Sequence, residues 1–425
     1  MIELYEHQKE IINEGKKQTG IFHGTGSGKT ITTLMLAKGD TLIVCPKTQK
    51  LDKTWEKNLA LLDKDITITV VSKEMFRRDY EHYARYETLI FDECHEGILG
   101  ATPQVIYSNR VAYPKTSKLF EAARQYILTR RPDRIYLVSA TPTRSPMAIW
   151  AAGVLLGRWG MDTFFQFRDI YYIPMPTDRR IFLVRKDKKT KERLGKVVRS
   201  LGYTGRLSDW VDVPDQTYKD VEVGLTKEQN DMLEEIPLMY PDPLVGTQKM
   251  YQVEQGFLHE EGEPTKVFKE NYSKKILEYW DEFHKLFLIV NYTWQIDYLE
   301  KVMKKHTKNV FVISGKRKDR EQQIEKANSV EEGVVIAQAM VTSGYELPSY
   351  PCTIFVSFSH RIVDYIQACG RVLRANAIKK NLYIHLITGE QSEARLESIK
   401  QKEDFHEATY AKEKYKKLFE KQKDK

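Results

Sequence analysis

The sequence predicts an α/β fold with two parallel-sheet lobes in tandem. Two patterns support this prediction: β-branched apolar runs alternate with helix-like segments in two separate parts of the chain, and each early run ends in polar or glycine-rich residues. Near-continuous apolar strands that alternate with helices are typical of parallel sheets covered on both faces, with ligands at the carboxyl ends of the strands. The length of 425 residues also exceeds the roughly 250–300 residues that one hydrophobic core serves.

The first series of runs lies in residues 1–160, which we predict as lobe 1. Its members are GIFHG, DTLIVCP, ITITVVS, ETLIFDE and RIYLVSATP. In residues 161–270 the pattern gives way to aromatic and charged residues, so we expect lobe-edge elements and a connecting region there. Strand-like runs return in residues 271–400 as KLFLIVNY, NVFVISG, EGVVIAQA, CTIFVSF and NLYIHLI, and predict lobe 2. Residues 401–425 are rich in lysine and predict a C-terminal helix with a solvated face.

Composition narrows the class of protein. Hydrophobic residues make up 41% and charged residues 30%, and no run approaches the roughly 18 apolar residues that a membrane helix needs. The four cysteines form no C-x-x-C pair and the N-terminus has no apolar signal core, so we expect a cytoplasmic protein without a membrane partner. Lysine and arginine exceed aspartate and glutamate by 67 − 59 = 8, which permits nucleic-acid binding without identifying the partner.

A glycine-rich segment, GIFHGTGSGKTITTL at residues 20–34, follows a predicted strand and opens a predicted helix. Its glycines allow the backbone N–H groups to face a triphosphate at the helix N-terminus. Lys29 would then reach the β- and γ-phosphates, and the Thr30 hydroxyl would bind Mg²⁺. His23 stands where the strict G-x-x-x-x-G-K-[ST] pattern has its first glycine. We predict that ATP and Mg²⁺ are the cofactors and that this loop binds ATP through Gly26, Ser27, Gly28, Lys29 and Thr30.

A second segment, LIFDECHEG at residues 89–97, places acidic residues directly after an apolar run. Asp92 is expected to supply the second carboxylate for the metal, and Glu93 to orient and deprotonate the attacking water. A metal cage made from Cys94 and His95 lacks further ligands at usable spacing, so we expect Cys94 to pack at the start of a helix.

Two arginines are candidates for stabilising the transition state. Arg371 and Arg374 lie in DYIQACGRVLRAN, and their spacing of three predicts that they share one face of a helix. From the second lobe they could point together across a cleft at the γ-phosphate. The alternative is a surface pair of arginines held by salt bridges.

In their order along the chain, these segments resemble the motifs of superfamily-two DExH helicases and translocases, and specifically of Swi/Snf-type ATPases in a compact phage or bacterial form. LYEHQKE resembles the Q motif, IVCPKTQKLDKTWEK motif Ia, VSKEMF motif Ib, DECH motif II and SATP motif III. ISGKRKDREQQIEKAN resembles motif IV, IAQAMVTSGYELPS motif V and QACGRVLR motif VI. Two departures are Thr342 and Ser343, which replace a glycine pair, and ANAIKK after Arg374.

The resemblance implies two RecA-like lobes that bind ATP between them and nucleic acid across their tops. It implies that Gln8 reads adenine, whose N6 and N7 an amide can pair with. It assigns coupling between nucleotide and nucleic acid to His95, Ser139, Thr141 and Gln367. Phosphate contacts, which position a strand without reading its sequence, are implied for Lys47, Thr48, Ser72, Ser314, Gly315, Thr342 and Ser343.

The predicted function is an ATP-dependent DNA helicase or translocase of phage or bacterial DNA replication, recombination or repair. It would act in the bacterial cytoplasm or the phage-infected host, with DNA favoured over RNA as partner. The alternatives are a duplex-DNA translocase that does not separate strands, an RNA helicase, and a nucleic-acid-binding module without hydrolysis. A P-loop kinase for a small molecule is disfavoured by the second lobe.

Overall fold

The computed structural model describes residues 3–108, 110–142, 145–176, 178–185, 187–260, 265–315, 317, 319–341, 345–373 and 380–410, the side chains of the last helix as far as residue 400. The chain divides into two compact units, and the boundary between them falls after Val211. We call residues 3–211 unit 1 and residues 212–403 unit 2.

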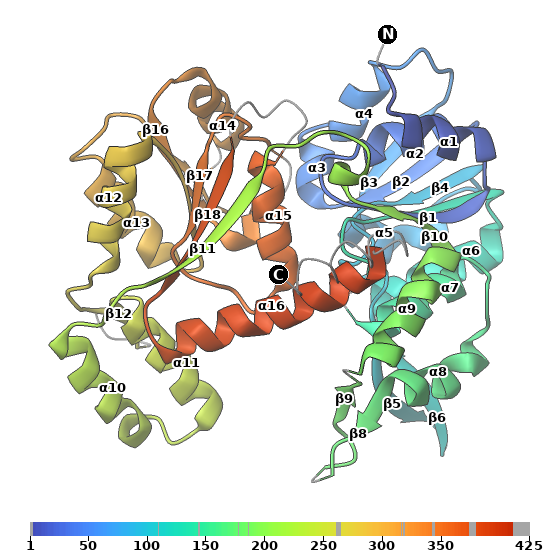
Figure 1. The fold of residues 1–425 in the computed structure, drawn as a ribbon. Helices are drawn as coiled ribbons and strands as arrows, with labels where there is room; N and C mark the ends of the chain where they lie inside the picture. Colours follow the sequence, from blue (N-terminus) through green and yellow to red (C-terminus); the bar gives the residue numbers. More distant parts are fainter. Residues whose placement is uncertain are drawn as a thin grey trace, which may run out of the picture. The chain divides into compact units, whose positions relative to one another are not determined.

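Unit 1 is built on a six-stranded sheet whose neighbouring strands are all parallel, in the order β10-β1-β7-β4-β2-β3 (Figure 1). The strands are β1 (Gln18–His23), β2 (Thr41–Cys45), β3 (Ile68–Ser72), β4 (Thr88–Phe91), β7 (Arg134–Val138) and β10 (Gly202–Gly205). β1, β4 and β7 lie side by side, so the segments that follow them, including the glycine-rich loop and DECH, emerge at one edge of the sheet.

Both faces of this sheet are buried. Successive side chains of each strand point to opposite faces, so each strand contributes to two cores. Phe22, Leu89 and Phe91 belong to a core formed with α6, α7 and α9, whereas Ile21 and Ile90 belong to a core formed with α2 and α4. The helices of unit 1 are α1 (Glu6–Glu14), α2 (Lys29–Leu36), α3 (Lys47–Leu51), α4 (Thr54–Leu59), α5 (Lys73–Asp79), α6 (Lys118–Arg130), α7 (Pro146–Leu155), α8 (Phe164–Tyr171) and α9 (Lys188–Leu201).

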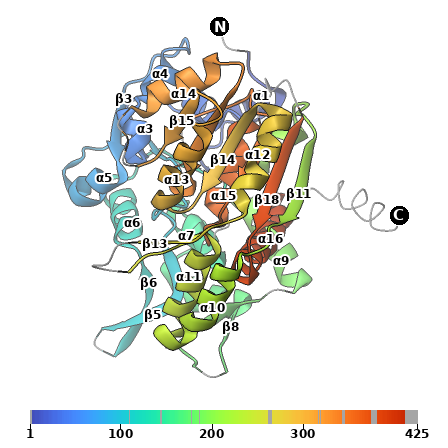
Figure 2. The same ribbon diagram turned by 90° about the vertical axis from the view of Figure 1, so that its left-hand side faces the viewer.

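Two antiparallel hairpins extend from unit 1. One consists of β5 (Ala101–Ser108) and β6 (Val111–Thr116), and the other of β8 (Tyr172–Pro174) and β9 (Phe182–Val184). The β5–β6 hairpin begins at Ala101, a short turn segment after DECH, and returns to the start of α6 (Figure 2).

Unit 2 repeats the parallel architecture with the strand order β11-β18-β17-β14-β16-β15. The strands are β11 (Gln216–Glu222), β14 (Lys285–Val290), β15 (Val310–Ile313), β16 (Gly333–Gln338), β17 (Cys352–Phe355) and β18 (Asn381–Ile387). The helices are α10 (Lys227–Met239), α11 (Pro243–Glu254), α12 (Tyr272–Phe283), α13 (Thr293–Met303), α14 (Arg320–Ser329), α15 (Ile362–Val372) and α16 (Glu390–Tyr410). A short pair, β12 (Phe257–Leu258) and β13 (Lys266–Val267), completes the unit.

The predicted fold class is confirmed: each unit is an α/β lobe around a parallel sheet, consistent with tandem RecA-like domains. Each apolar run predicted as a strand forms one, and the segment 161–270 adds an edge strand to each sheet, β10 and β11. None of the helices in the described part of the chain is long and apolar enough to cross a membrane.

Candidate nucleotide and nucleic-acid site

The glycine-rich loop joins β1 to α2 and leaves the first turn of α2 without a side-chain cap. Gly26 and Gly28 have φ values of 78° and 74°, in the left-handed region that favours glycine. A Cβ atom on Gly28 would also lie 2.5 Å from Nε2 of Gln8. The two glycines therefore let the backbone turn tightly before α2. The main-chain N–H groups in the first turn of α2 then point outward in the arrangement that binds anions at helix N-termini.

Two side chains of the loop donate hydrogen bonds to the main-chain oxygen of Gly24, near the start of the loop. The Ser27 hydroxyl donates to the main-chain oxygen of Gly24 at 2.8 Å, and Nζ of Lys29 donates to the same oxygen at 2.9 Å. The Gly24 N–H donates to the main-chain oxygen of Gly205 in β10, also at 2.8 Å. Lys29 thus lies folded over the loop, and Thr30 is half-buried one residue further along α2.

Gln8 holds the loop from the other side. Its Nε2 donates to the main-chain oxygen of Gly28 at 3.1 Å and to the Thr32 hydroxyl at 3.0 Å, and its Oε1 accepts from the Tyr5 N–H at 2.9 Å. Both amide protons are therefore engaged with the loop and α2. The assignment of Gln8 as the adenine reader stays a prediction.

An aromatic cluster beside the loop was not predicted from the sequence. The ring of His7 stacks on Trp210, with centroids 3.7 Å apart and an angle of 15° between the planes, and Trp210 also contacts the ring of His23. Nε2 of His7 lies 3.1 Å from the main-chain oxygen of Ser27, so the tautomer protonated at Nε2 donates a hydrogen bond to the loop. The residue that replaces the first P-loop glycine is therefore buried in this cluster.

The DECH segment forms a turn at the end of β4. Its Cys94 N–H donates to the main-chain oxygen of Val138 in β7 at 3.0 Å, and the Asp92 carboxylate accepts from the Glu93 N–H at 2.8 Å. Glu93 has a φ of 44°, an uncommon conformation for a residue with a side chain. Oε2 of Glu93 is buried and lies 3.3 Å from Nδ1 of His95. The role of Glu93 as the base stays a prediction.

Asp92 lies in a charged, water-poor setting. Burial raises the pKa of Asp92 to about 7, and the neighbouring Glu93 carboxylate acts in the same direction. The ammonium groups of Lys73 and Lys29 lower the pKa of Asp92, which places both charges near this carboxylate. β1 and β4 both pair with β7, so the segments that carry Lys29 and Asp92 follow strand ends at the same edge of the sheet. That the two residues share a nucleotide site stays a prediction.

A hydrogen-bonded chain connects the DECH turn to the SATP segment. Nδ1 of His95 lies 2.9 Å from the Ser139 hydroxyl and 3.3 Å from Oε2 of Glu93. The Ser139 oxygen in turn accepts from the Thr141 N–H at 2.9 Å. The structure thus brings Glu93, His95 and Ser139 together, and the coupling role assigned to His95, Ser139 and Thr141 stays a prediction.

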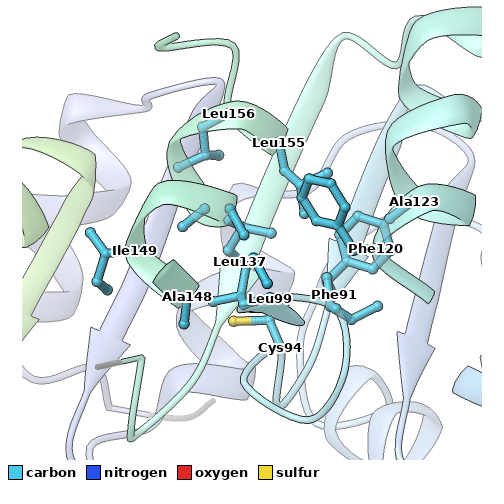
Figure 3. Packing of buried hydrophobic residues seen from close by; sticks show 14 of the residues in the cluster. Phe91, Cys94, Leu99, Phe120, Ala123, Leu137, Ala148, Ile149, Leu155 and Leu156 are labelled. Carbon is cyan, nitrogen blue, oxygen red and sulfur yellow. The ribbon is translucent and has the colours of Figure 1, made fainter. Parts of the chain in front are cut away.

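Cys94 points away from this chain. Figure 3 shows its sulfur among Leu99, Leu137 and Ala148, within the core of unit 1. Burial raises the pKa of the Cys94 thiol, so the sulfur remains protonated. The packing role expected for Cys94 agrees with this position, but the residues after Phe91 form turns rather than the helix start we expected.

Lys73 is a residue that the sequence analysis missed. It is 6% exposed, and its Nζ donates to the main-chain oxygen of Glu93 at 2.7 Å and to Oε2 of Glu96 at 3.2 Å. It directly follows Ser72, a predicted phosphate contact, at the start of α5. A lysine immediately after an apolar strand was the available signal, because a charge at the end of a buried strand requires a partner nearby.

In unit 2, Arg371 lies on α15 and is 8% exposed. Its Nε donates to the main-chain oxygen of Gln367 at 2.9 Å, and its Nη1 to that of Tyr345 at 2.7 Å. α15 ends at Val372, and Arg374 lies outside the described residues. The prediction that the two arginines share a helix face can therefore be followed for Arg371 alone.

The predicted phosphate contacts fall into three groups. Lys47 and Thr48 are exposed at the start of α3, and Gly315 is exposed after β15. Ser72 and Ser314 are buried, and the Ser72 hydroxyl caps α5 by accepting from the Met75 N–H at 3.3 Å. Thr342 and Ser343 lie outside the described residues. The role of each as a nucleic-acid contact stays a prediction.

The residues of unit 1 fit a nucleotide with a divalent cation. The uncapped start of α2 and Lys29 suit phosphate oxygens, and the buried carboxyl of Asp92 would gain a positive partner. Thr30 and Asp92 are the residues that would hold Mg²⁺.

The comparison with protein families concerns unit 2. Residues 269–376, which contain β14 to β17 and α15, match the helicase conserved C-terminal domain. This part of the chain is similar to a helicase C-terminal domain. The match supports a member of helicase superfamily one or two, and such a domain implies nucleic-acid binding, ATP use and a helicase- or translocase-type function. A search of curated proteins found no match to the chain.

Proposed function

We propose that the chain is an ATP-dependent DNA helicase or translocase of the DExH, Swi/Snf-like type. The proposal is supported by the shared sheet edge at which β1 and β4 end, just before Lys29 and Asp92, in a chain whose residues 269–376 match a helicase domain. Lys29 binds the phosphates, Asp92 and Thr30 hold Mg²⁺, and Glu93 takes the proton of the attacking water. The bound metal would neutralise charge on the phosphate oxygens.

In this proposal hydrolysis is coupled to movement through two elements. The chain from Glu93 through His95 to Ser139 transmits the state of the nucleotide within unit 1. Arg371 and Arg374 of unit 2 contribute positive charge to the transferred phosphate, so that hydrolysis requires both units. Arg371 would have to exchange its main-chain partners for the phosphate.

Three alternatives compete with this proposal. A duplex translocase hydrolyses ATP without separating strands, an RNA helicase uses RNA as its track, and a binding module does not turn over ATP. The intact set of Lys29, Asp92 and Glu93 favours hydrolysis. We propose DNA as the partner, in phage or bacterial replication, recombination or repair.

The test is an ATPase assay of the full chain without nucleic acid and with single-stranded DNA, duplex DNA, forked or four-way junction DNA, and RNA. We expect DNA to raise the hydrolysis rate and RNA to raise it less. Equal rates in all reactions contradict the proposal. A strand-displacement assay on the most effective DNA then separates a helicase from a duplex translocase.

A further inference from the structure

The β5–β6 hairpin exposes more apolar surface than its own packing requires. The side chains of Ile106, Tyr107, Val111 and Tyr113 are 53%, 75%, 50% and 47% exposed. Clusters of exposed large apolar side chains on a soluble protein mark interaction sites, because their hydration opposes such an arrangement. These side chains therefore make the hairpin a candidate interaction surface.

Register divides these side chains between two faces. Ile106 pairs with Tyr113 and Ser108 pairs with Val111, so these four residues share one face, whereas Tyr107 pairs with Ala112 on the opposite face. Ile106, Ser108 and Tyr113 line a groove of about 970 Å³.

The charged side chains that line the groove come from two helices, and basic residues outnumber acidic ones. Glu74, Arg77 and Arg78 come from one face of α5, where their spacing of three and four places them together. Lys118, Glu121 and Arg124 come from the first turns of α6. The lining of the groove thus includes four basic and two acidic side chains.

Two of the arginines already have acidic neighbours. Arg78 pairs with Asp79 at 2.7 Å and Arg124 pairs with Glu121 at 3.1 Å. Exposed pairs of this kind contribute little stability, so a phosphate can replace the carboxylate at low cost. Arg77 is exposed on α5 within the groove.

We propose that this groove binds a single strand of nucleic acid, with a base stacked on Tyr113 and the backbone held by Arg77 and Lys118. Aromatic rings beside arginine and lysine are the combination that binds single strands, because rings stack on bases while cations follow the phosphates. An apolar peptide offers no negative charge to the basic side chains of the groove, and a duplex has no free base to stack on Tyr113. The strand class rests on the proposed function, and α5, which lines the groove through Glu74, Arg77 and Arg78, begins directly after Ser72, a proposed phosphate contact.

The base of the hairpin gives this groove a connection to catalysis. The Ser117 hydroxyl donates to the main-chain oxygen of Gly97 at 2.5 Å, and the Ser117 N–H donates to that of Gly100 at 2.6 Å. Both acceptors lie in the turns that follow DECH, and Lys73 joins α5 to the main chain of Glu93. A nucleic-acid strand bound in the groove would therefore contact α5 and the β5–β6 hairpin. Hydrogen bonds from α5 and from the base of the hairpin hold the segment that contains Glu93.

The experiment measures the binding of a fluorescein-labelled oligo(dT) strand to the full chain by fluorescence anisotropy. Tyr113→Ala removes the stacking ring and is expected to raise Kd roughly fivefold to a hundredfold, the range that corresponds to losing one base–aromatic stack. Arg77→Ala is expected to weaken binding and to reduce its dependence on salt. Tyr107→Ala is the matched control, because it removes an exposed tyrosine from the opposite face of the same hairpin.

The outcomes separate this inference from the proposed function. A wild-type chain that binds no nucleic acid contradicts the proposed function, and it also contradicts the proposed binding of a single strand in the groove. A wild-type chain that binds the strand while Tyr113→Ala and Arg77→Ala bind it equally well overturns the groove alone. Equal losses in Tyr107→Ala and Tyr113→Ala also overturn it, as does an equal loss by Tyr113→Ala on a blunt duplex. Thermal unfolding of each variant, expected to match the wild type, checks the fold.

Discussion

Replacing Lys73 by methionine tests how the DECH turn is held. Methionine keeps an unbranched apolar side chain in the buried position but removes the ammonium that donates to the main-chain oxygen of Glu93 at 2.7 Å. Glu93 has a φ of 44°, and non-glycine residues in that region carry strain of about 1–3 kcal/mol that their surroundings must offset. We expect Lys73→Met to release Glu93 from the position in which its carboxylate can act on water.

The magnitude follows from the hydrogen bond that is lost. A hydrogen bond to a charged group contributes about 1.5–3 kcal/mol, which corresponds to a roughly 10- to 150-fold fall in kcat if all of it positions Glu93. The loss of the Lys73 ammonium also removes a cation that lowers the pKa of Asp92, so the KM for ATP should rise, but by a smaller factor than kcat falls, because Lys29 and the start of α2 are untouched. Steady-state ATPase kinetics measure both quantities, and thermal unfolding confirms that the variant is folded.

Two controls divide the effect. Lys73→Arg keeps the charge and should recover part of the rate. Glu96→Gln removes the ion pair at 3.2 Å but leaves the bond to the Glu93 main chain, so its effect should be small. A folded Lys73→Met protein with the wild-type kcat would refute the reasoning.

Three further predictions concern other parts of the structure. Ser139→Ala removes the partner of His95 at 2.9 Å and should reduce the stimulation of ATPase by DNA roughly two- to tenfold, as for the loss of one neutral hydrogen bond; the ratio of rates with and without DNA measures it, and an unchanged ratio contradicts the coupling role. Trp210→Ala removes the half-buried ring stacked on His7 and should lower the free energy of unfolding by about 2 kcal/mol, less than a fully buried ring, with Trp210→Phe as the milder control; a denaturation midpoint that does not move would contradict it. Burial raises the pKa of Glu254 from 4.5 to about 7, so the folded protein retains a proton that the unfolded chain loses, and stability should fall as pH rises from about 4.5 to about 7, by about 3 kcal/mol at most. Urea unfolding at several pH values across this range gives the free energy of unfolding as a function of pH. This free energy should change less with pH in Glu254→Gln than in the wild type, and an equal change contradicts the assignment.

Sequence patterns predicted the sheets because their inner strands are buried on both faces. Runs such as TLIVC in β2 and KLFLIV in β14 are continuous apolar segments, which few other structures explain. The edge strands β10 and β11 escaped prediction because GYTG and QTYKDVE have no such run. Their pairing depends on the neighbouring strand rather than on their own residues.

The candidate site likewise has some features that the sequence predicts and others that it does not. The placement of Lys29 and Asp92 could be predicted because each follows a recognisable strand, and chemistry gathers at the carboxyl ends of parallel strands. The stack of Trp210 on His7 could not, since it joins residues about 200 positions apart. The present hydrogen bonds of Arg371 were also beyond the sequence, because a guanidinium has several donors and the fold decides which carbonyls meet them.

We propose that Glu93 activates water for ATP hydrolysis in a chain that works on nucleic acid. The most direct measurement compares ATP hydrolysis, ATP binding and DNA binding of the wild-type chain with those of Glu93→Gln, with DNA present. Glutamine keeps the size of the side chain and cannot take a proton, so hydrolysis should be lost while both ligands still bind. A Glu93→Gln protein that hydrolyses ATP at the wild-type rate would contradict the account.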